Sequence, residues 1–133
     1  MIKTTCTLLA IGFLSCGTFV AMHNNAQAAE PELRPTQKAM QARAGWVKSM
    51  SENLAAMKLG EVQKDALALA SQTSAAAEKQ QVPLAKELTL KVSSLASATG
   101  EAAGKKDGET VKIKLAEIKA TCGECHAKIR DKK

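Results

Sequence analysis

The chain has 133 residues, with 19 Lys and Arg against 13 Asp and Glu, and aromatic residues make up 2% of it. The basic residues are spread along the sequence and no aromatic platforms accompany them, which argues against nucleic-acid binding. The length suits one domain. The net charge is +6. Lysines that face solvent on helices are one interpretation of this charge, and binding to acidic partner proteins is the other.

The first 28 residues have the pattern of a secretory signal peptide. Lys3 supplies a positive charge, residues 8–20 are apolar, and AQA at residues 26–28 is a small-x-small cleavage site. The apolar run is too short and too interrupted for a membrane-spanning helix, so we expect no stable membrane insertion. Acylation of Cys16 is an alternative that the neighbouring residues fit poorly. The sequence therefore predicts export to the periplasm and removal of residues 1–28.

Residues 29–133 form the predicted mature domain. They contain two cysteines, one histidine, one aromatic residue (Trp46) and three methionines, and their net charge is +5. A domain of about 105 residues has a modest core, which benefits from an additional buried group. Ala, Leu, Lys, Glu and Gln dominate the composition, which favours helix nearly throughout. The predicted fold class is all-α.

Turn signals divide the mature domain into four helical segments. The first ends at Gly60, the second runs from Glu61 to about Gln80, Pro83 opens the third, and GKKDG at residues 104–108 precedes the fourth. Short connections predict an antiparallel up-down-up-down four-helix bundle. Apolar residues recur in each segment at steps of three and four, which indicates one buried face per helix. These positions are Met40, Ala44, Val47, Met50 or Ser51, Leu54 and Met57; Val62, Ala66, Leu69, Thr73 and Ala76; Leu84, Leu88, Val92 or Lys91, and Leu95; and Val111, Leu115, Ile118, Cys122, Cys125 and Ile129.

The fourth segment contains Cys122-Gly123-Glu124-Cys125-His126. This C-x-x-C-H pattern is that of covalent c-type haem attachment. Two thiols one helical turn apart can form thioethers with the two vinyl groups of a porphyrin, and the next residue brings an imidazole to the iron. In a helix Cys122, Cys125 and His126 share one face, which is also the apolar face. The haem is therefore predicted to enter the bundle core near the C-terminus of the last helix.

Three other interpretations of the two cysteines are weaker. A thioredoxin-like redox pair follows a strand in a βαβ context, and this sequence predicts no strand. A structural zinc site needs four ligands, and the mature domain offers two cysteines and one histidine besides its carboxylates. A disulfide across two intervening helical residues would be strained, although export permits oxidation. A helical adaptor that binds metal without haem is the remaining alternative.

A haem motif on the last helix of a four-helix bundle resembles the class II c-type cytochromes, the family of cytochrome c prime and its low-spin relatives. The tail CGECHAKIRDKK is similar to that family's ending, in which an aliphatic or aromatic residue and an arginine follow the histidine; here these are Ile129 and Arg130. The resemblance implies one covalently bound haem c per chain and contact of Arg130 with a haem propionate. Lys128 and Arg43 are alternatives for that contact, and a solvated charge is a further alternative for each.

The same resemblance implies electron transfer with redox partner proteins. No paired carboxylates and no serine–histidine arrangement are visible, so we expect no enzymatic activity. A five-coordinate haem protein that binds NO or CO, as cytochrome c prime does, is the alternative function. Relatives often dimerise through their first two helices, which leaves a homodimer open.

The sixth position on the iron decides between these functions. His126 is the one histidine of the mature domain, and a methionine thioether is the natural second ligand. In an up-down-up-down bundle the end of the fourth helix lies beside the start of the first, where Met40 is found. Met50 and Met57 lie roughly 15 Å and 25 Å further along the bundle. Met40, in the segment TQKAM, also resembles the methionine ligand of low-spin class II members. A shift of one turn would bring Arg43 or Ala44 to the haem instead, and Met40 would then be a flexible core residue.

Overall fold

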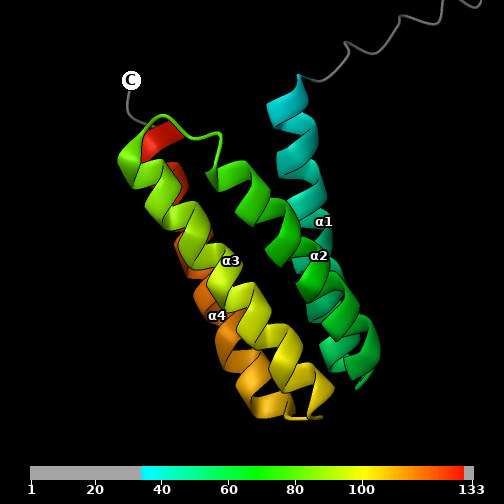
Figure 1. Ribbon diagram of the computed structural model, residues 1–133. Coiled ribbons are helices and arrows are strands. Elements are labelled where there is room, and N and C mark those ends of the chain that lie inside the picture. The colour runs from blue at the N-terminus through cyan, green and yellow to red at the C-terminus, as the bar shows by residue number, and fades with distance from the viewer. Residues whose placement is uncertain (1–33, 131–133) are drawn as a thin grey trace, which may run out of the picture. The chain divides into compact units, whose positions relative to one another are not determined.

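Helices account for nearly all of residues 34–130, the part of the chain that the computed structural model describes (Figure 1). The predicted all-α class is confirmed, since these residues contain no strand. No helix among them is long and apolar enough to cross a membrane. The predicted signal peptide lies outside the described residues. The helices are α1 (Pro35–Ala55), α2 (Leu59–Ala77), α3 (Pro83–Gly104) and α4 (Gly108–Cys125), and a π-helical turn, η1 (His126–Arg130), continues α4.

The four helices pack together around one apolar core and form a helical bundle. α2 packs along α3, α3 packs along α4, and α1 packs against α2 and, less extensively, against α4. Each helix therefore has two principal neighbours. Buried core residues come from all four helices, and many are alanines: Met50, Val62, Ala66, Leu69, Ala70, Val92, Ala96, Ala102, Ala103, Val111, Leu115 and Ile118.

Small residues bring α2 and α3 close together. A Cβ atom on Gly104 would lie only 2.7 Å from Nε2 of Gln63. Further along the same interface, the Ser93 hydroxyl donates a hydrogen bond to the carbonyl oxygen of Ala70 at 2.9 Å. Gln63 on α2 thus lies beside Gly104 on α3, and Ala70 on α2 lies beside Ser93 on α3.

α3 begins at Pro83 as predicted, whereas α2 begins at Leu59, two residues before the predicted Glu61. Pro35 and Pro83 occupy first-turn positions of α1 and α3, where a missing N–H is harmless. α4 begins after Asp107, whose carboxylate accepts hydrogen bonds from the backbone N–H and the hydroxyl of Thr110 at 3.0 and 2.6 Å. This cap lowers the pKa of Asp107, because both bonds favour the charged carboxylate.

The predicted boundary at Gly60 is wrong, because α1 ends earlier and Gly60 lies in the first turn of α2. The chain reverses at Met57, which has a positive φ of 56°. The N–H groups of Met57 and Lys58 donate to the carbonyl oxygens of Leu54 and Asn53 at 3.0 and 2.8 Å. These are the paired bonds of a Schellman motif, which stabilises a left-handed residue other than glycine.

The first helix buries less than its sequence pattern predicts. Met50 is its one fully buried residue, while Trp46, Val47 and Leu54 pack partly against the core. Met57 was predicted to lie on the apolar face but is 72% exposed, because α1 has already ended before it. The N-terminal half of α1 faces a cavity instead of close-packed neighbours.

Candidate functional site

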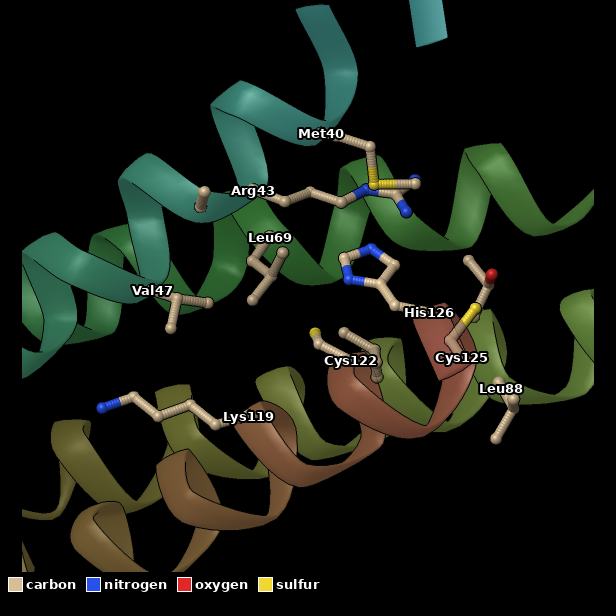
Figure 2. A pocket seen from close by; sticks show the side chains of 12 residues that line it. Met40, Arg43, Val47, Leu69, Leu88, Lys119, Cys122, Cys125 and His126 are labelled. Carbon is tan, nitrogen blue, oxygen red and sulfur yellow. The ribbon is translucent and has the colours of Figure 1, made fainter. Parts of the chain in front are cut away.

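The C-x-x-C-H motif lies on the wall of a cavity between the N-terminal half of α1 and the end of α4. This inner cavity has a volume of about 240 Å³. Most of its lining atoms belong to apolar side chains, and all four helices contribute (Figure 2). The lining residues are Met40, Arg43, Ala44 and Val47 from α1, Leu69 from α2, Leu88, Thr89 and Val92 from α3, and Lys119, Cys122, Cys125 and His126 from α4 and η1.

Helical spacing brings the three motif residues to this cavity, as the sequence predicts. Cys122, Cys125 and His126 all line it, all three are half-buried, and both thiols are free. The backbone N–H of His126 still reaches the carbonyl oxygens of Cys122 and Gly123, and the π-helical turn begins at this residue. Single π turns often mark functional sites within helices. Figure 2 shows the His126 imidazole pointing across the cavity toward α1.

An outer cavity of about 700 Å³ adjoins the inner one. The two share Met40, Arg43, Thr89, Cys125 and His126 as lining residues, so a single ligand could extend through both. The outer cavity is the more polar of the two. Its remaining lining residues are Arg34, Thr36, Gln37, Gln41, Gln80, Ala85, Ile129 and Arg130.

Met40 is the methionine that reaches this site. It lines both cavities, is 37% exposed, and extends from α1 over the cavity that holds the His126 imidazole (Figure 2). Met50 is fully buried in the core and Met57 is exposed, and neither lines the inner or the outer cavity. The structure therefore brings together the four predicted site residues Met40, Cys122, Cys125 and His126.

Arg43 adds a positive charge to the inner wall. Its Nε–H donates a hydrogen bond of 2.7 Å to Oε1 of Gln72, across from α1 to α2. Burial lowers the pKa of Arg43, because desolvation disfavours the charged guanidinium. An arginine nevertheless stays protonated in a protein, so the cavity contains a permanent cation. Arg43 lines this cavity together with Met40 and His126, and Figure 2 shows its side chain extending from α1.

Burial and the Arg43 charge act in opposite directions on the two thiols. Burial raises the pKa of Cys122 and of Cys125, while the nearby guanidinium lowers both values by a smaller amount. The net effect is a pKa above that of an ordinary cysteine. Both side chains are therefore neutral thiols at pH 7, which suits an apolar cavity.

The other predicted site residues lie at different places. Arg130 lines the outer cavity, so it could contact the carboxylate of a ligand bound there. Lys128 points away to an exposed ion pair with Glu124 at 2.6 Å, so its use as an alternative to Arg130 is not favoured. Trp46 packs against the core and lines neither cavity.

Comparison with known proteins identifies no relative. No protein-family model, curated protein or solved structure matches the chain. Within residues 34–130, no three or more His, Cys, Asp or Glu side chains are grouped so that they could hold a metal ion by themselves. The geometry of the cavity therefore carries the functional argument.

Sequence reasoning missed the polar residues around the cavity. Gln72 lies on α2 among alanines, serine and threonine, and nothing in its spacing indicates a contact 29 residues away. Thr89 follows a predicted core residue; its hydroxyl is satisfied by the carbonyl oxygen of Ala85 at 2.7 Å, as back-bonding within a helix allows. Lys119 resembles any other exposed helical lysine. Only the packing of α1 against α2 and α4 reveals these neighbours.

Proposed function

We propose that the chain is an exported mono-haem c-type cytochrome of the class II type that transfers electrons. Cys122 and Cys125 would hold the haem by thioethers, His126 would be one axial ligand, and Met40 would be the sixth ligand. One observation carries the proposal: Met40, which lies more than 80 residues before the C-x-x-C-H motif in the sequence, lines one cavity of a helical bundle together with Cys122, Cys125 and His126.

The residues that line the cavity suit such a group in their chemistry. The inner part is mostly apolar and is lined by residues of all four helices, which suits a porphyrin ring, and Arg34 and Arg130 line the outer part, which suits the propionates. Imidazole and thioether are a known axial pair for haem in c-type cytochromes, and the thioether raises the reduction potential. When bound, the haem would supply a one-electron ferric/ferrous couple.

The residues of the chain would position the group and keep water away. Cys122, Cys125 and His126 line one cavity at the point where α4 passes into the π-helical turn. Val47 and Leu69 line the inner cavity and would keep water away from the bound group. Met40 lines both cavities and is 37% exposed. A haem beside it would therefore have one edge close to the protein surface for electron exchange.

An antiparallel up-down-up-down course of the helices is part of this proposal. Two observations support it. Gln63 on α2 lies against Gly104 on α3, while Ala70 lies against Ser93, as in helices that run in opposite directions. The connections between consecutive helices are also short, which favours antiparallel neighbours.

Redox proteins with an acidic surface are the proposed partners, and the periplasm is the proposed location. The net charge of +5 on residues 29–133 supports brief electrostatic docking onto a negative partner. The signal-peptide pattern of residues 1–28 supports export, and covalent attachment of haem c takes place outside the cytoplasm in the class of proteins that this chain resembles.

A second function has specific support. A haem without a sixth ligand would bind NO or CO, and the apolar Val47 and Leu69 side chains at the cavity wall would favour such an open position. Met40 is 37% exposed, so part of its side chain lies at the protein surface. In this alternative the Met40 thioether would pack beside the haem rather than bind the iron.

The mass and the visible spectrum of the purified exported protein test the proposal. We expect the mature chain to carry the added mass of one covalent haem and to show a six-coordinate low-spin ferric spectrum. A high-spin spectrum, with ready CO binding after reduction, would select the second function. A colourless protein with two thiols that alkylate readily would refute both.

A further inference from the structure

The inner cavity is mostly apolar, yet a half-buried arginine, Arg43, lines it. Arg43 and Lys119 are the charged side chains among its lining residues. Lys119 is exposed, so solvent screens its charge. Arg43 is half-buried, and its guanidinium interacts electrostatically with both Cys122 and Cys125. The charge of Arg43 is thus felt at the end of the cavity where the thiols lie.

A second residue holds Arg43 in this position. Oε1 of Gln72 accepts the Nε–H at 2.7 Å, and both side chains are partly buried. This bond uses one of the five N–H donors of a guanidinium and links α1 to α2. Gln72 is neutral, so it orients the guanidinium without cancelling its charge. A glutamate at this place would orient it equally well and cancel most of the charge.

We propose that Arg43, held by Gln72, is a positioning residue that raises the reduction potential of the cofactor in this cavity. The inference rests on the proposed haem. Ferric iron carries one more positive charge than ferrous iron, so a neighbouring cation destabilises the ferric state more. The effect is strong where burial weakens solvent screening, because charges near a protein surface interact through an effective dielectric constant of about 20 rather than 80.

The magnitude follows from that screening. Removal of one full charge from the wall of a half-buried cavity should lower the equilibrium constant for reduction about tenfold, which is about 59 mV for a one-electron couple. The same loss of charge on the solvent-exposed side of α1 should have little effect, since ions and water screen it.

Two variants and one control test the role of Arg43. Arg43→Gln removes the charge, and Gln72→Glu keeps the hydrogen bond but adds a compensating negative charge. Lys48→Gln is the matched control, because Lys48 is a 77% exposed cation on the same helix and its loss changes the total charge equally. Reduction potentials are measured by spectroscopic titration of the purified haem proteins, and absorption spectra show whether the ligands are unchanged.

We expect both cavity variants to have a potential lower by about 59 mV, and the control to match the parent. Unchanged potentials in a haem-loaded Arg43→Gln or Gln72→Glu protein would overturn the inference, and so would an equal shift in Lys48→Gln. If Arg43→Gln fails to retain haem, Gln72→Glu decides alone. Absence of haem in the parent protein would instead refute the proposed function, so the two failures are distinguishable.

Discussion

If the proposed haem is bound, its loss should cost the bundle most of its stability. The change is the double substitution Cys122→Ser and Cys125→Ser, which removes both covalent anchors and alters each side chain by a single atom. In the proposed holoprotein a porphyrin fills the inner cavity of about 240 Å³. Without it the cavity contains water or collapses, and the surrounding side chains lose their contacts.

The magnitude follows from the cavity volume. Core cavities cost about 24 cal/mol per Å³, so a volume of about 240 Å³ corresponds to about 6 kcal/mol. This figure is an upper bound, because the cavity opens to solvent and its walls can relax. Domains of this size are stable by about 5–15 kcal/mol in total, so a loss of this order leaves little.

The composition of the core makes compensation by the remaining residues small. Many buried positions are alanines, among them Ala66, Ala96 and Ala103, and an alanine buries little apolar surface. α1 contributes only Met50 as a fully buried residue. The helices that surround the cavity therefore have few large side chains that could move into it.

Thermal unfolding followed by circular dichroism at 222 nm provides the assay. We expect the double variant to show a broad, weakly cooperative transition far below the parent's midpoint. The parent chain purified without covalent haem is the matched control, since it keeps both cysteines and should melt like the variant. A cooperative transition of the double variant near the midpoint of the haem-loaded parent would refute the reasoning.

Three further predictions concern single residues. Met40→Ala should convert the ferric spectrum of the holoprotein from low spin to high spin, whereas an unchanged spectrum would exclude Met40 as a ligand. Gly45→Ala should stabilise α1 by about 0.5–1 kcal/mol, since a Cβ atom there meets nothing within 4 Å; a lower melting temperature would contradict this. Asp107→Asn keeps a capping oxygen but does not titrate. Because hydrogen bonds from Thr110 lower the pKa of Asp107 in the folded state, its charge stabilises the fold above its unfolded pKa of about 3.9, and this contribution is lost as pH falls through the lower folded value. The parent's melting temperature should therefore fall more between pH 6 and pH 3 than that of Asp107→Asn; equal losses would contradict this assignment.

Much of the fold could be predicted from local sequence signals. The helix class follows from composition, and the start of α3 follows from Pro83. The apolar face of α4 is confirmed at Val111, Leu115 and Ile118, all of which are buried. These features depend on neighbours in the sequence, whose spacing a helix fixes.

The ends of helices were predicted less well. Glycine was expected to end both α1 and α3, yet Met57 and Lys106 take the positive φ angles. Gly104 is the last residue of α3 and Gly108 the first of α4. A Schellman motif depends on backbone hydrogen bonds that any residue can make. Residue type alone therefore does not locate the turn.

The candidate site also has a part that the sequence predicts and a part that it does not. Cys122, Cys125 and His126 could be placed on one face from their spacing, and Met40 could be placed near them from helix lengths. The Arg43–Gln72 pair depends on how α1 packs against α2, and no local pattern contains that information. Long-range contacts between helices were thus the part that sequence reasoning could not supply.

The shallow attachment of α1 has a consequence for how a rigid ring could enter the bundle. α2, α3 and α4 bury residues along their whole lengths, whereas α1 is anchored chiefly through Met50. Segments with few buried contacts open at a lower free energy than the rest of a protein. We therefore expect α1 to separate from the other three helices at a lower free energy than global unfolding, which would give the proposed haem a way into the bundle.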